Sequence, residues 1–440
     1  MLVNMNQISS LTKNEFNRQR DTLNLIASEN YPSPKTLSLL GSIWSNKYGE
    51  GYPGKRYYAG NQYTDELELY ANSKALQIFD PNNHYGVNLQ VLSGSPANST
   101  VYLSVLEQGD TIMSLNLASG GHLSHLHTTS NWGKFFKLVN YDLKEEGENQ
   151  LNLFKIDVED YKQKLIDYKP RLVILGFSSY TQKYEFSELI KLAHEAGSLV
   201  LADIAHINGL VACGLHSSPF LGDTDIEQAD FVSMTTHKTF RGPRGAMLFA
   251  KNTLPEYAKI ITKSKSLTEI INKTIFPGTS GGPHFQQMAA VAQSCLEILG
   301  EDNYPDNIDF KTYSQNVLNN TKALENGLKE SGLEIISPTE NHICLIKLPN
   351  SLDSLDFQKK LESLGIISNR NSIPFDTKLP YRPSGMRFGM SALTSRGINR
   401  LDSHLIGTLI GQIASDKIST AETQTKIQEI LNKLNWYYNF

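Results

Sequence analysis

Between about residues 84 and 251, short apolar runs alternate with amphipathic stretches. Runs of this length, bounded by polar and turn residues, are typical of buried strands. The intervening stretches 102–106 and 186–194 carry apolar residues at helical spacing. Alternation of this kind predicts an α/β fold, with a mostly parallel sheet flanked by helices. The predicted strands are 87–92, 111–115, 172–177, 199–203, 231–234 and 247–250.

The pattern changes after the turn-rich cluster at 276–283. Helical spacing then covers 286–299 and 313–331, a strand-like run follows at 343–346, and an amphipathic stretch over 422–434 predicts a terminal helix. These elements predict a smaller α+β domain, and 440 residues are enough for two cores. The expected organisation is an N-terminal arm over 1–43, a large domain over 44–285 and a small domain over 286–440.

Lys238 lies just past the predicted strand at 231–234, and the glycine-rich sequence TFRGPRG follows it. An isolated buried ammonium is costly, so a lysine at the edge of a core needs a reason. One such reason is a Schiff base with a carbonyl cofactor. The alternative is a lysine at a strand end whose charge stays in water. This segment alone leaves both open.

Asp203 ends the predicted strand 199–203. The carboxyl ends of parallel strands face the crevice where α/β sheets bind ligands. Pyridoxal phosphate needs a carboxylate there, because the carboxylate keeps the ring nitrogen protonated and lets the ring accept electrons from a carbanion. Taken alone, Asp203 also suits a helix N-cap. Asp203 and Lys238, 35 residues apart and both at strand ends, together favour a pyridoxal phosphate site.

Composition narrows the classes of partner. The net charge of −4 gives no reason to expect nucleic acid or an anionic membrane. No apolar run approaches the roughly 20 residues that span a bilayer, and the N-terminus has neither a signal nor a transit pattern. Cys213, Cys295 and Cys344 are too few and too far apart for a disulfide frame or a metal site. We therefore expect a cytoplasmic protein without a metal.

Several motifs occur in a fixed order along most of the chain. They are LIASENY (25–31), NKYGEGYPGKRYY (46–58), SGSPAN (93–98), GGHL (120–123), THKT (236–239) and FPG (276–278), with SGMRFG (384–389) after them. In this order they resemble the serine hydroxymethyltransferase family. The resemblance implies a fold-type I, aspartate-aminotransferase-like enzyme of one-carbon metabolism that uses pyridoxal 5′-phosphate, with tetrahydrofolate as co-substrate, and that forms a homodimer or tetramer.

The cofactor phosphate needs backbone N–H groups and hydroxyls at a helix N-terminus. Gly94 and Ser95 follow a predicted strand, and Pro96 suits the first turn of a helix, although a plain strand-to-helix turn has the same pattern. By resemblance His237 also reaches the phosphate. Further phosphate contacts are expected from a neighbouring subunit, at Tyr48, Gly281 and Gly282.

The resemblance also assigns residues to the cofactor ring and to the amino-acid substrate. His122 matches a histidine stacked on the ring, and Thr235 a residue near the lysine; Ser178 and His206 match residues near the ring hydroxyl and the substrate. Arg387 matches the arginine that binds the substrate carboxylate, a role that suits its bidentate guanidinium. A loop histidine and a surface arginine are the ordinary alternatives for His122 and Arg387.

Three further positions complete the substrate site expected from the resemblance. Glu50 handles the proton of the substrate hydroxyl and the one-carbon unit, Tyr58 shapes the pocket, and Ser28 contacts substrate from the partner chain. A solvated loop is the alternative for Glu50 and Tyr58. Arg244 matches an arginine near the active-site loop. The positions that match folate contacts are Leu117, Gly121, His122, Leu123, Asn371 and Tyr381.

The sequence departs from the family pattern at few positions: Asn24, Gln182, Asn208 and the pair Met390–Ser391, which follows the substrate arginine. None removes an expected catalytic group, but Met390–Ser391 raises the question of how the substrate loop fits.

The expected activity is the reversible conversion of L-serine and tetrahydrofolate into glycine and 5,10-methylene-tetrahydrofolate. One alternative is a folate-independent aldolase or transaldolase that acts on threonine or other 3-hydroxy amino acids on the same scaffold. Glu50 and Asn371 argue against it, because both match residues of the folate reaction. A second alternative is a scaffold protein without activity, and the intact set Lys238, Asp203, His122 and Arg387 argues against that.

Overall fold

The computed structural model describes residues 5–125, 130–147, 153–258, 260 and 262–439. Its main feature is a seven-stranded sheet in the order β4-β12-β11-β10-β9-β5-β6. Strands β6, β5, β9, β10 and β11 are parallel, whereas β12 runs antiparallel to both β11 and β4. The predicted mostly parallel α/β sheet is thus confirmed. The strands are β4 (Tyr85–Asn88), β5 (Thr111–Leu115), β6 (Lys137–Tyr141), β9 (Leu172–Gly176), β10 (Leu199–Asp203), β11 (Phe231–Thr235) and β12 (Ala246–Lys251).

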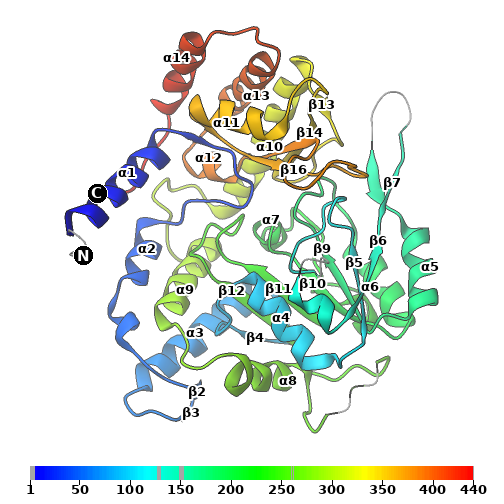
Figure 1. Ribbon diagram of the computed structural model, residues 1–440. Coiled ribbons are helices and arrows are strands. Elements are labelled where there is room, and N and C mark those ends of the chain that lie inside the picture. The colour runs from blue at the N-terminus through cyan, green and yellow to red at the C-terminus, as the bar shows by residue number, and fades with distance from the viewer. Residues whose placement is uncertain (1–4, 126–129, 148–152, 259, 261, 440) are drawn as a thin grey trace.

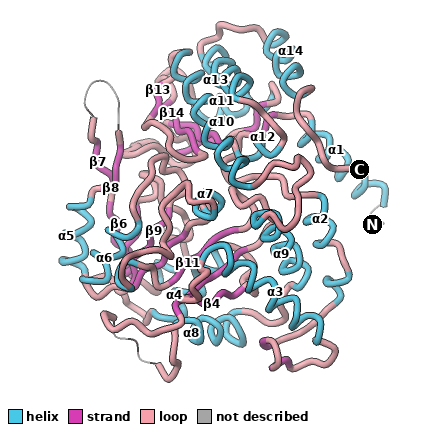
Figure 2. Tube along the Cα trace, turned by 180° about the vertical axis from the view of Figure 1, so that it is seen from behind, coloured by secondary structure: helices cyan, strands magenta, loops and turns pink. Residues whose placement is uncertain are grey.

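Helices cover both faces of this sheet (Figures 1 and 2). Side chains alternate along each strand: Val173 and Leu175 of β9 belong to the core on one face, and Leu172 and Ile174 to the core on the other. The first core includes residues of α3, α5, α6 and α9, and the second includes residues of α4 and α8. These helices are α3 (Gln62–Phe79), α4 (Gly94–Val105), α5 (Val158–Tyr168), α6 (Phe186–Glu195), α8 (Leu267–Lys273) and α9 (Phe285–Leu299).

Two predicted boundaries in this region are wrong. The strand predicted at 87–92 ends at Asn88, because the Asn88 side chain accepts a hydrogen bond from the backbone N–H of Gln90 (2.8 Å) and turns the chain. The helix predicted at 102–106 is only the last part of α4, which begins at Gly94. The strands predicted at 111–115 and 199–203 match β5 and β10 residue for residue.

A second, antiparallel sheet has the order β13-β14-β17-β16. It packs with helices around a separate core that includes Leu324, Ile346 and Phe388. Figure 1 shows these elements gathered above the large sheet. They are α10 (Phe310–Glu330), β13 (Glu334–Ile335), β14 (Ile343–Lys347), α11 (Ser354–Ser363), β16 (Asn369–Asn371), β17 (Gly385–Gly389), α12 (Ser391–Ser395), α13 (Arg400–Ala414) and α14 (Thr420–Leu431).

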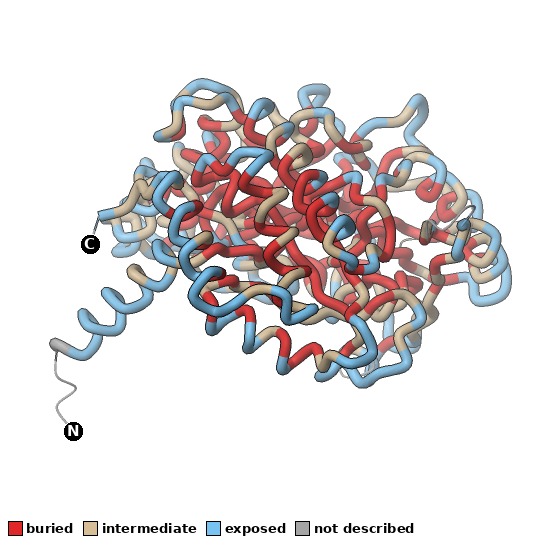
Figure 3. Tube along the Cα trace, turned by 90° about the horizontal axis from the view of Figure 1, so that it is seen from above, coloured by how far each residue is buried: buried red, intermediate tan, exposed pale blue. Residues whose placement is uncertain are grey.

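The N-terminal segment joins the second core. Strand β1 (Leu23–Asn24) pairs in parallel with β15 (Ile366–Ile367), and Leu23 and Leu25 are buried in that core. The preceding α1 (Met5–Arg20) extends from the body and is largely exposed (Figure 3). The remaining elements are α2 (Pro34–Leu40), β2 (Gly51–Tyr52), β3 (Lys55–Arg56), β7 (Leu143–Glu145), β8 (Phe154–Ile156), α7 (Asn208–Ala212), and the short helices η1 (Ile43–Asn46), η2 (Asn131–Lys134), η3 (Asp225–Glu227) and η4 (Thr274–Thr279).

Within the described residues, every helix is too short or too polar to cross a membrane.

Candidate active site

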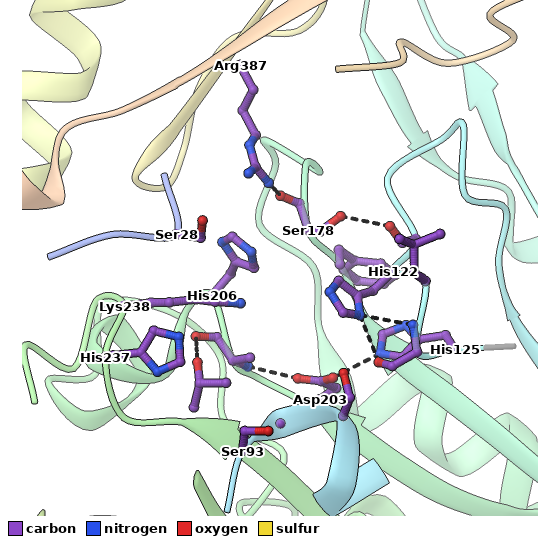
Figure 4. A pocket seen from close by; sticks show the side chains of 18 of the residues that line it. Ser28, Ser93, His122, His125, Ser178, Asp203, His206, His237, Lys238 and Arg387 are labelled. Carbon is purple, nitrogen blue, oxygen red and sulfur yellow. Dashed lines mark hydrogen bonds and ion pairs between the residues drawn. The ribbon is translucent and has the colours of Figure 1, made fainter. Parts of the chain in front are cut away.

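A cavity of about 470 Å³ opens at the carboxyl ends of β9, β10 and β11. The cavity lies at the edge of the sheet where a ligand site was expected, because parallel strands direct their carboxyl ends to one edge. The small sheet closes the cavity from the opposite side with Asn371 and Arg387 (Figure 4). Of the predicted site residues, those that line the cavity are Ser28, Gly94, Ser95, Leu117, Gly121, His122, Leu123, Ser178, Asp203, His206, Thr235, His237, Lys238, Arg244, Asn371 and Arg387.

Lys238 extends into the cavity from the turn that follows β11 (Figure 4). The residue is only 8% exposed. Burial lowers the pKa of its amine to about 8; Asp203 opposes this shift, and the charges of Arg387 and Arg244 add to it. Roughly a tenth of the amine is therefore neutral at pH 7, far more than for an ordinary lysine, and the neutral form is the nucleophile that attacks carbonyl carbon.

Asp203 ends β10 at the floor of the cavity, and both of its oxygens are held. Oδ2 lies 2.9 Å from Nε2 of His125 and accepts a 2.8 Å hydrogen bond from Asn98, while Oδ1 accepts from the backbone N–H of Ala205 (3.0 Å). Burial alone raises the pKa of Asp203, but His125 and Asn98 outweigh it and hold that pKa well below its usual range. The carboxylate is therefore charged at any physiological pH.

His125 is a site residue that the sequence prediction missed. It lines the cavity and contacts Asp203, which lies 78 positions later in the chain. A signal was present, because GGHLSH places a second histidine three residues after His122. The rings of the two histidines lie 5.5 Å apart. Burial lowers the pKa of His122 to about 4, and its Nδ1 lies 2.7 Å from the hydroxyl of Ser124.

Backbone packing fixes the loop that carries His122. Gly120 has a φ of 116°, in the region that favours glycine, and a Cβ there would lie 3.1 Å from the backbone nitrogen of Tyr180. A Cβ on Gly121 would lie 2.3 Å from the carbonyl oxygen of Leu115. The hydroxyl of Ser178 donates to the carbonyl of Gly121 (2.7 Å), so the loop is tied to the end of β9. This packing places His122 beside the cavity.

The N-terminus of α4 forms one end of the cavity. Ser93 is its N-cap, and the Ser93 side chain makes no capping hydrogen bond, so its hydroxyl is free for a ligand. His237 faces the same cavity, and its Nδ1 is buried without a hydrogen-bond partner. Burial, with smaller effects of Arg244 and Lys238, lowers the pKa of His237 to about 3. Free hydroxyls, a neutral imidazole and a helix N-terminus together suit an anionic group.

Arg387 enters the cavity from β17 on the opposite side. Its Nε donates to Asn369 (3.2 Å), and a terminal nitrogen donates to the backbone carbonyl of Ser178. Burial lowers its pKa to about 10, so the guanidinium stays charged at neutral pH. In the described part of the chain no carboxylate lies within 4 Å of it. A buried cation of this kind requires an anion, which a ligand carboxylate supplies.

His206 and Thr235 complete the wall around Lys238. Nδ1 of His206 lies 3.3 Å from Nε2 of His342, and both rings are buried. Burial lowers the pKa of His206 well below its usual value, so the ring is neutral. The hydroxyl of Thr235 contacts the carbonyl of Ala205 (3.3 Å). These contacts link the segment after β10 to the segment that carries Lys238.

Five predicted residues gather elsewhere, outside the cavity of their own chain: Tyr48, Glu50, Tyr58, Gly281 and Gly282. Tyr48 donates to Glu50 (3.3 Å), and its ring meets that of Tyr58 edge-on at 5.0 Å. A Cβ on Gly282 would lie 3.0 Å from the Tyr48 ring. We name this group the tyrosine cluster. Tyr48 is 54% exposed and Tyr58 46%, so both rings reach the surface of the chain.

Other expected placements differ from the structure. Ser28 was predicted to act from a partner chain, but it lines the cavity of its own chain. The pairing of β1 with β15 fixes the N-terminal segment just before Ser28. Tyr381 lies outside the cavity and is 63% exposed; the guanidinium of Arg370 holds its ring at 4.7 Å. Met390 is fully buried in the core of the small sheet, so it does not shape the cavity.

Comparison with known proteins decides the family. A family model described as serine hydroxymethyltransferase matches residues 2–410. The chain belongs to the serine hydroxymethyltransferase family. All the residues that line the cavity, from Ser28 to Arg387, lie within this range.

Two relatives with the printed name "Serine hydroxymethyltransferase" are similar to the chain over nearly its whole length. The protein of Desulfotalea psychrophila is 40% identical over 432 residues, which cover 97% of this chain and 93% of the relative. The protein of Methanosarcina barkeri is 40% identical over 431 residues, with 97% and 96% covered. The resemblance inferred from the motifs is thus confirmed, and the serine hydroxymethyltransferase family extends over both sheets.

Proposed function

We propose that the protein catalyses the reversible conversion of L-serine and tetrahydrofolate into glycine and 5,10-methylene-tetrahydrofolate, with pyridoxal 5′-phosphate as cofactor. One arrangement carries the proposal: a buried Lys238 amine with a lowered pKa lies in the same cavity as a fixed Asp203 carboxylate and an Arg387 guanidinium without an anion. Each of these three groups would gain one binding partner from a cofactor bound together with an amino acid.

The residues present fit pyridoxal phosphate. Lys238 can hold its carbonyl carbon through Nζ, and the charged carboxylate of Asp203 suits a protonated ring nitrogen. The orphaned Nδ1 of His237 and the N-terminus of α4 suit the phosphate. His122 lies beside the cavity with a flat, neutral ring that can stack on a flat cofactor.

The chain's own groups then do the following work. Bound pyridoxal phosphate supplies an electron-withdrawing ring that stabilises negative charge at the amino-acid α-carbon. Arg387 binds the substrate carboxylate and so fixes the orientation of the bonds at that carbon. Asp203 would keep the proton on the ring nitrogen, and Lys238 would accept a proton as the neutral amine and return it as the ammonium.

Folate dependence rests on the tyrosine cluster and on the outer wall of the cavity. Leu117, Gly121, Leu123 and Asn371 line the wall where a pterin is proposed to bind. Glu50 is proposed to move the proton of the substrate hydroxyl as the one-carbon unit leaves. A folate-independent cleavage of 3-hydroxy amino acids would need Lys238, Asp203 and Arg387 but not Glu50.

A homodimer with composite sites is proposed from the same cluster. The tyrosine cluster can meet a cofactor phosphate only if a second copy brings it to the cavity. Next to it lies an apolar hollow lined by Trp44, Leu67 and Tyr70. Ile43 is 78% exposed and Tyr63 65% exposed at its rim, and exposed apolar side chains that lie together in this way suit an interaction surface. We therefore propose that this face is covered by a second copy of the chain. A tetramer built from two such dimers would keep the same contact.

Two further proposals concern the domain organisation of the chain and its cellular location. The division into an arm at 1–43, a large domain at 44–285 and a small domain at 286–440 stays a prediction. Met288 and Val291 of α9 lie beyond residue 285 but pack in the core of the large sheet. A cytoplasmic location is proposed because the three cysteines are free thiols, as a reducing compartment would leave them.

The proposed activity is tested by serine cleavage with and without tetrahydrofolate. The purified protein should show the visible absorbance of bound pyridoxal phosphate, and borohydride reduction followed by peptide mapping should label Lys238. Serine cleavage should rise strongly when tetrahydrofolate is added. A label on another lysine would remove the cofactor assignment, and threonine cleavage that exceeds serine cleavage at saturating folate would favour the aldolase alternative.

A further inference from the structure

The side chain of Asn208, the first residue of α7, is fully buried beneath the segment that carries Lys238. Its Nδ2 donates a 2.7 Å hydrogen bond to the backbone carbonyl of Thr235. Its Oδ1 accepts from the backbone N–H of Gly209 (3.0 Å) and also lies 3.0 Å from the hydroxyl of Thr239. A buried amide is costly unless its polar atoms are paired, and here both ends are paired.

The partners of Asn208 lie on either side of the reactive lysine. Thr235 is the last residue of β11, and Thr239 directly follows Lys238. The amide of Asn208 therefore spans the base of the turn whose third residue is Lys238. The hydroxyl of Thr239 also lies 2.8 Å from the carbonyl of His206, which lines the cavity. Asn208 thus joins the segment of Asp203 and His206 to the segment of Lys238.

The packing leaves little room for movement between α7 and the turn that carries Lys238. A Cβ on Gly209 would lie 2.4 Å from the carbonyl oxygen of Thr239, so α7 and the lysine turn already touch through their backbones. Without the Asn208 side chain, the turn would lose the amide contacts with Thr235 and Thr239. The Thr239 hydroxyl would keep its contacts with the carbonyl of His206 (2.8 Å) and the N–H of Gly209 (3.1 Å), and Asn30 would still donate to the Lys238 carbonyl (2.7 Å). Loss of one support would let the turn move relative to β10.

We propose that Asn208 is a positioning residue that sets the place of the Lys238 amine relative to Asp203 and His206. This deepens the proposed function and rests on it, because it concerns the same cavity and the same lysine. Asn208 itself lines no part of the cavity and touches no reacting atom. It acts only through the backbone of Thr235 and the side chain of Thr239.

The test compares Asn208→Ala with the unaltered protein, both first without cofactor. Each is labelled with acetic anhydride across a pH series, and mass spectrometry measures the extent of labelling at Lys238. Asn208→Ala should shift the pH midpoint of Lys238 labelling upward, towards that of an ordinary lysine, because a looser turn admits water to a buried amine. With cofactor, kcat for serine should fall about 10- to 100-fold while KM changes less.

Asn320→Ala is the matched control. Asn320 is also a buried asparagine whose Nδ2 donates two hydrogen bonds, to Thr394 and to the carbonyl of Ile398, both at 3.0 Å and far from the cavity in the small-sheet core. It should lower the thermal midpoint of unfolding as Asn208→Ala does, but leave the labelling midpoint of Lys238 unchanged. If both variants shift the labelling midpoint equally, or neither does, Asn208 is only a structural residue and the proposal is overturned.

Thr239→Val covers the case in which Asn208→Ala does not fold. This change keeps the shape of the side chain and removes one hydroxyl, and it should shift the labelling midpoint in the same direction by a smaller amount. An unchanged midpoint would overturn the proposal. The cofactor assignment has a separate readout, the protection of Lys238 from labelling by added pyridoxal phosphate. If protection is absent, the proposed function fails, and the midpoint comparison still decides the role of Asn208.

Discussion

Nε2 of His125 lies 2.9 Å from Oδ2 of Asp203, and this contact orients the Asp203 carboxylate at the floor of the cavity. With Asn98 also on Oδ2 and the N–H of Ala205 on Oδ1, the carboxylate is held before any ligand arrives. A carboxylate fixed in advance needs no reorganisation when charge develops beside it. Electrostatic stabilisation is strongest when no such reorganisation is needed.

Asp203→Asn should therefore fold and bind cofactor but lose serine cleavage by about 10²- to 10³-fold, the usual cost of removing one strong electrostatic contact. Steady-state kinetics at saturating folate measure the loss. Asp230→Asn is a control, since Asp230 is a buried aspartate that contacts His194 at 3.0 Å, but lies at the amino end of β11. It should reduce stability with little effect on kcat. Near-normal turnover in Asp203→Asn would contradict the role of Asp203.

The lowered pKa of Lys238 predicts a pH-dependent penalty on stability. Its folded pKa of about 8 lies below the ordinary 10.5, so the unfolded chain binds more protons between these values and stability rises with pH in that window. Below pH 8 the full penalty applies, at most roughly 3 kcal/mol. Lys238→Met without cofactor should therefore be more stable than the unaltered protein at pH 7. Urea unfolding at pH 7 and pH 10 should show the difference shrinking, and a constant difference would count against the buried amine.

Continuous apolar runs made the strands of the large sheet predictable. β9, β10 and β11 are buried on both faces, so each appears in the sequence as a mainly apolar segment, and β10 and β11 end at polar residues, Asp203 and Thr235. The same ends placed Asp203 and Lys238 correctly. The apolar pattern covered only the end of α4, because its first turn, Gly94 to Pro96, adds no apolar residue; the start of the helix was indicated by Pro96 alone.

Contacts between distant segments could not be predicted from the sequence. The bond between His125 and Asp203 joins residues 78 positions apart, and that between Asn30 and Lys238 joins residues 208 apart. No local periodicity records either contact. Glu50 and Tyr58 were assigned to the site from motifs alone, and only the fold showed that they lie with Tyr48 outside the cavity of their own chain.

The unpaired guanidinium of Arg387 predicts a sharp dependence on the substrate carboxylate. Arg387→Ala should leave the absorbance of bound cofactor intact and weaken glycine binding by about 2–5 kcal/mol, the cost of removing one partner of a buried charge pair. Spectroscopic titration with glycine measures the change. Arg370→Ala is the control, since Arg370 packs on Tyr381 outside the cavity; it should bind glycine normally. An unaltered glycine affinity in Arg387→Ala would rule out the assigned role.

Composite sites predict complementation between two inactive variants. Lys238→Ala and Glu50→Gln should each be nearly inactive alone. In a mixed dimer, one cavity combines an intact Lys238 with the partner's intact Glu50, so activity should return when the two are refolded together. If Glu50 served the cavity of its own chain, both cavities of the mixed dimer would carry a defect and activity would stay absent. Refolding each variant with itself provides the background.

Folate dependence is the prediction that separates the proposed reaction from its nearest alternative. Glu50→Gln removes a carboxylate that is proposed to move a proton at the substrate hydroxyl, a contribution of about 10²- to 10⁴-fold. Serine cleavage with tetrahydrofolate should fall by that order. Cleavage of a bulkier 3-hydroxy amino acid such as threonine should change much less, because that reaction transfers no one-carbon unit to folate.

The control for Glu50→Gln is Tyr48→Phe, which removes the hydroxyl that donates to Glu50 at 3.3 Å but keeps the carboxylate. It should reduce serine cleavage less than Glu50→Gln does, because the proton-carrying group remains. Both reactions are measured on the same preparations, with cofactor absorbance as the check on occupancy. An equal loss of serine and threonine cleavage in Glu50→Gln would mean that Glu50 supports the cavity as a whole, and folate coupling would then have to depend on other residues, such as Asn371.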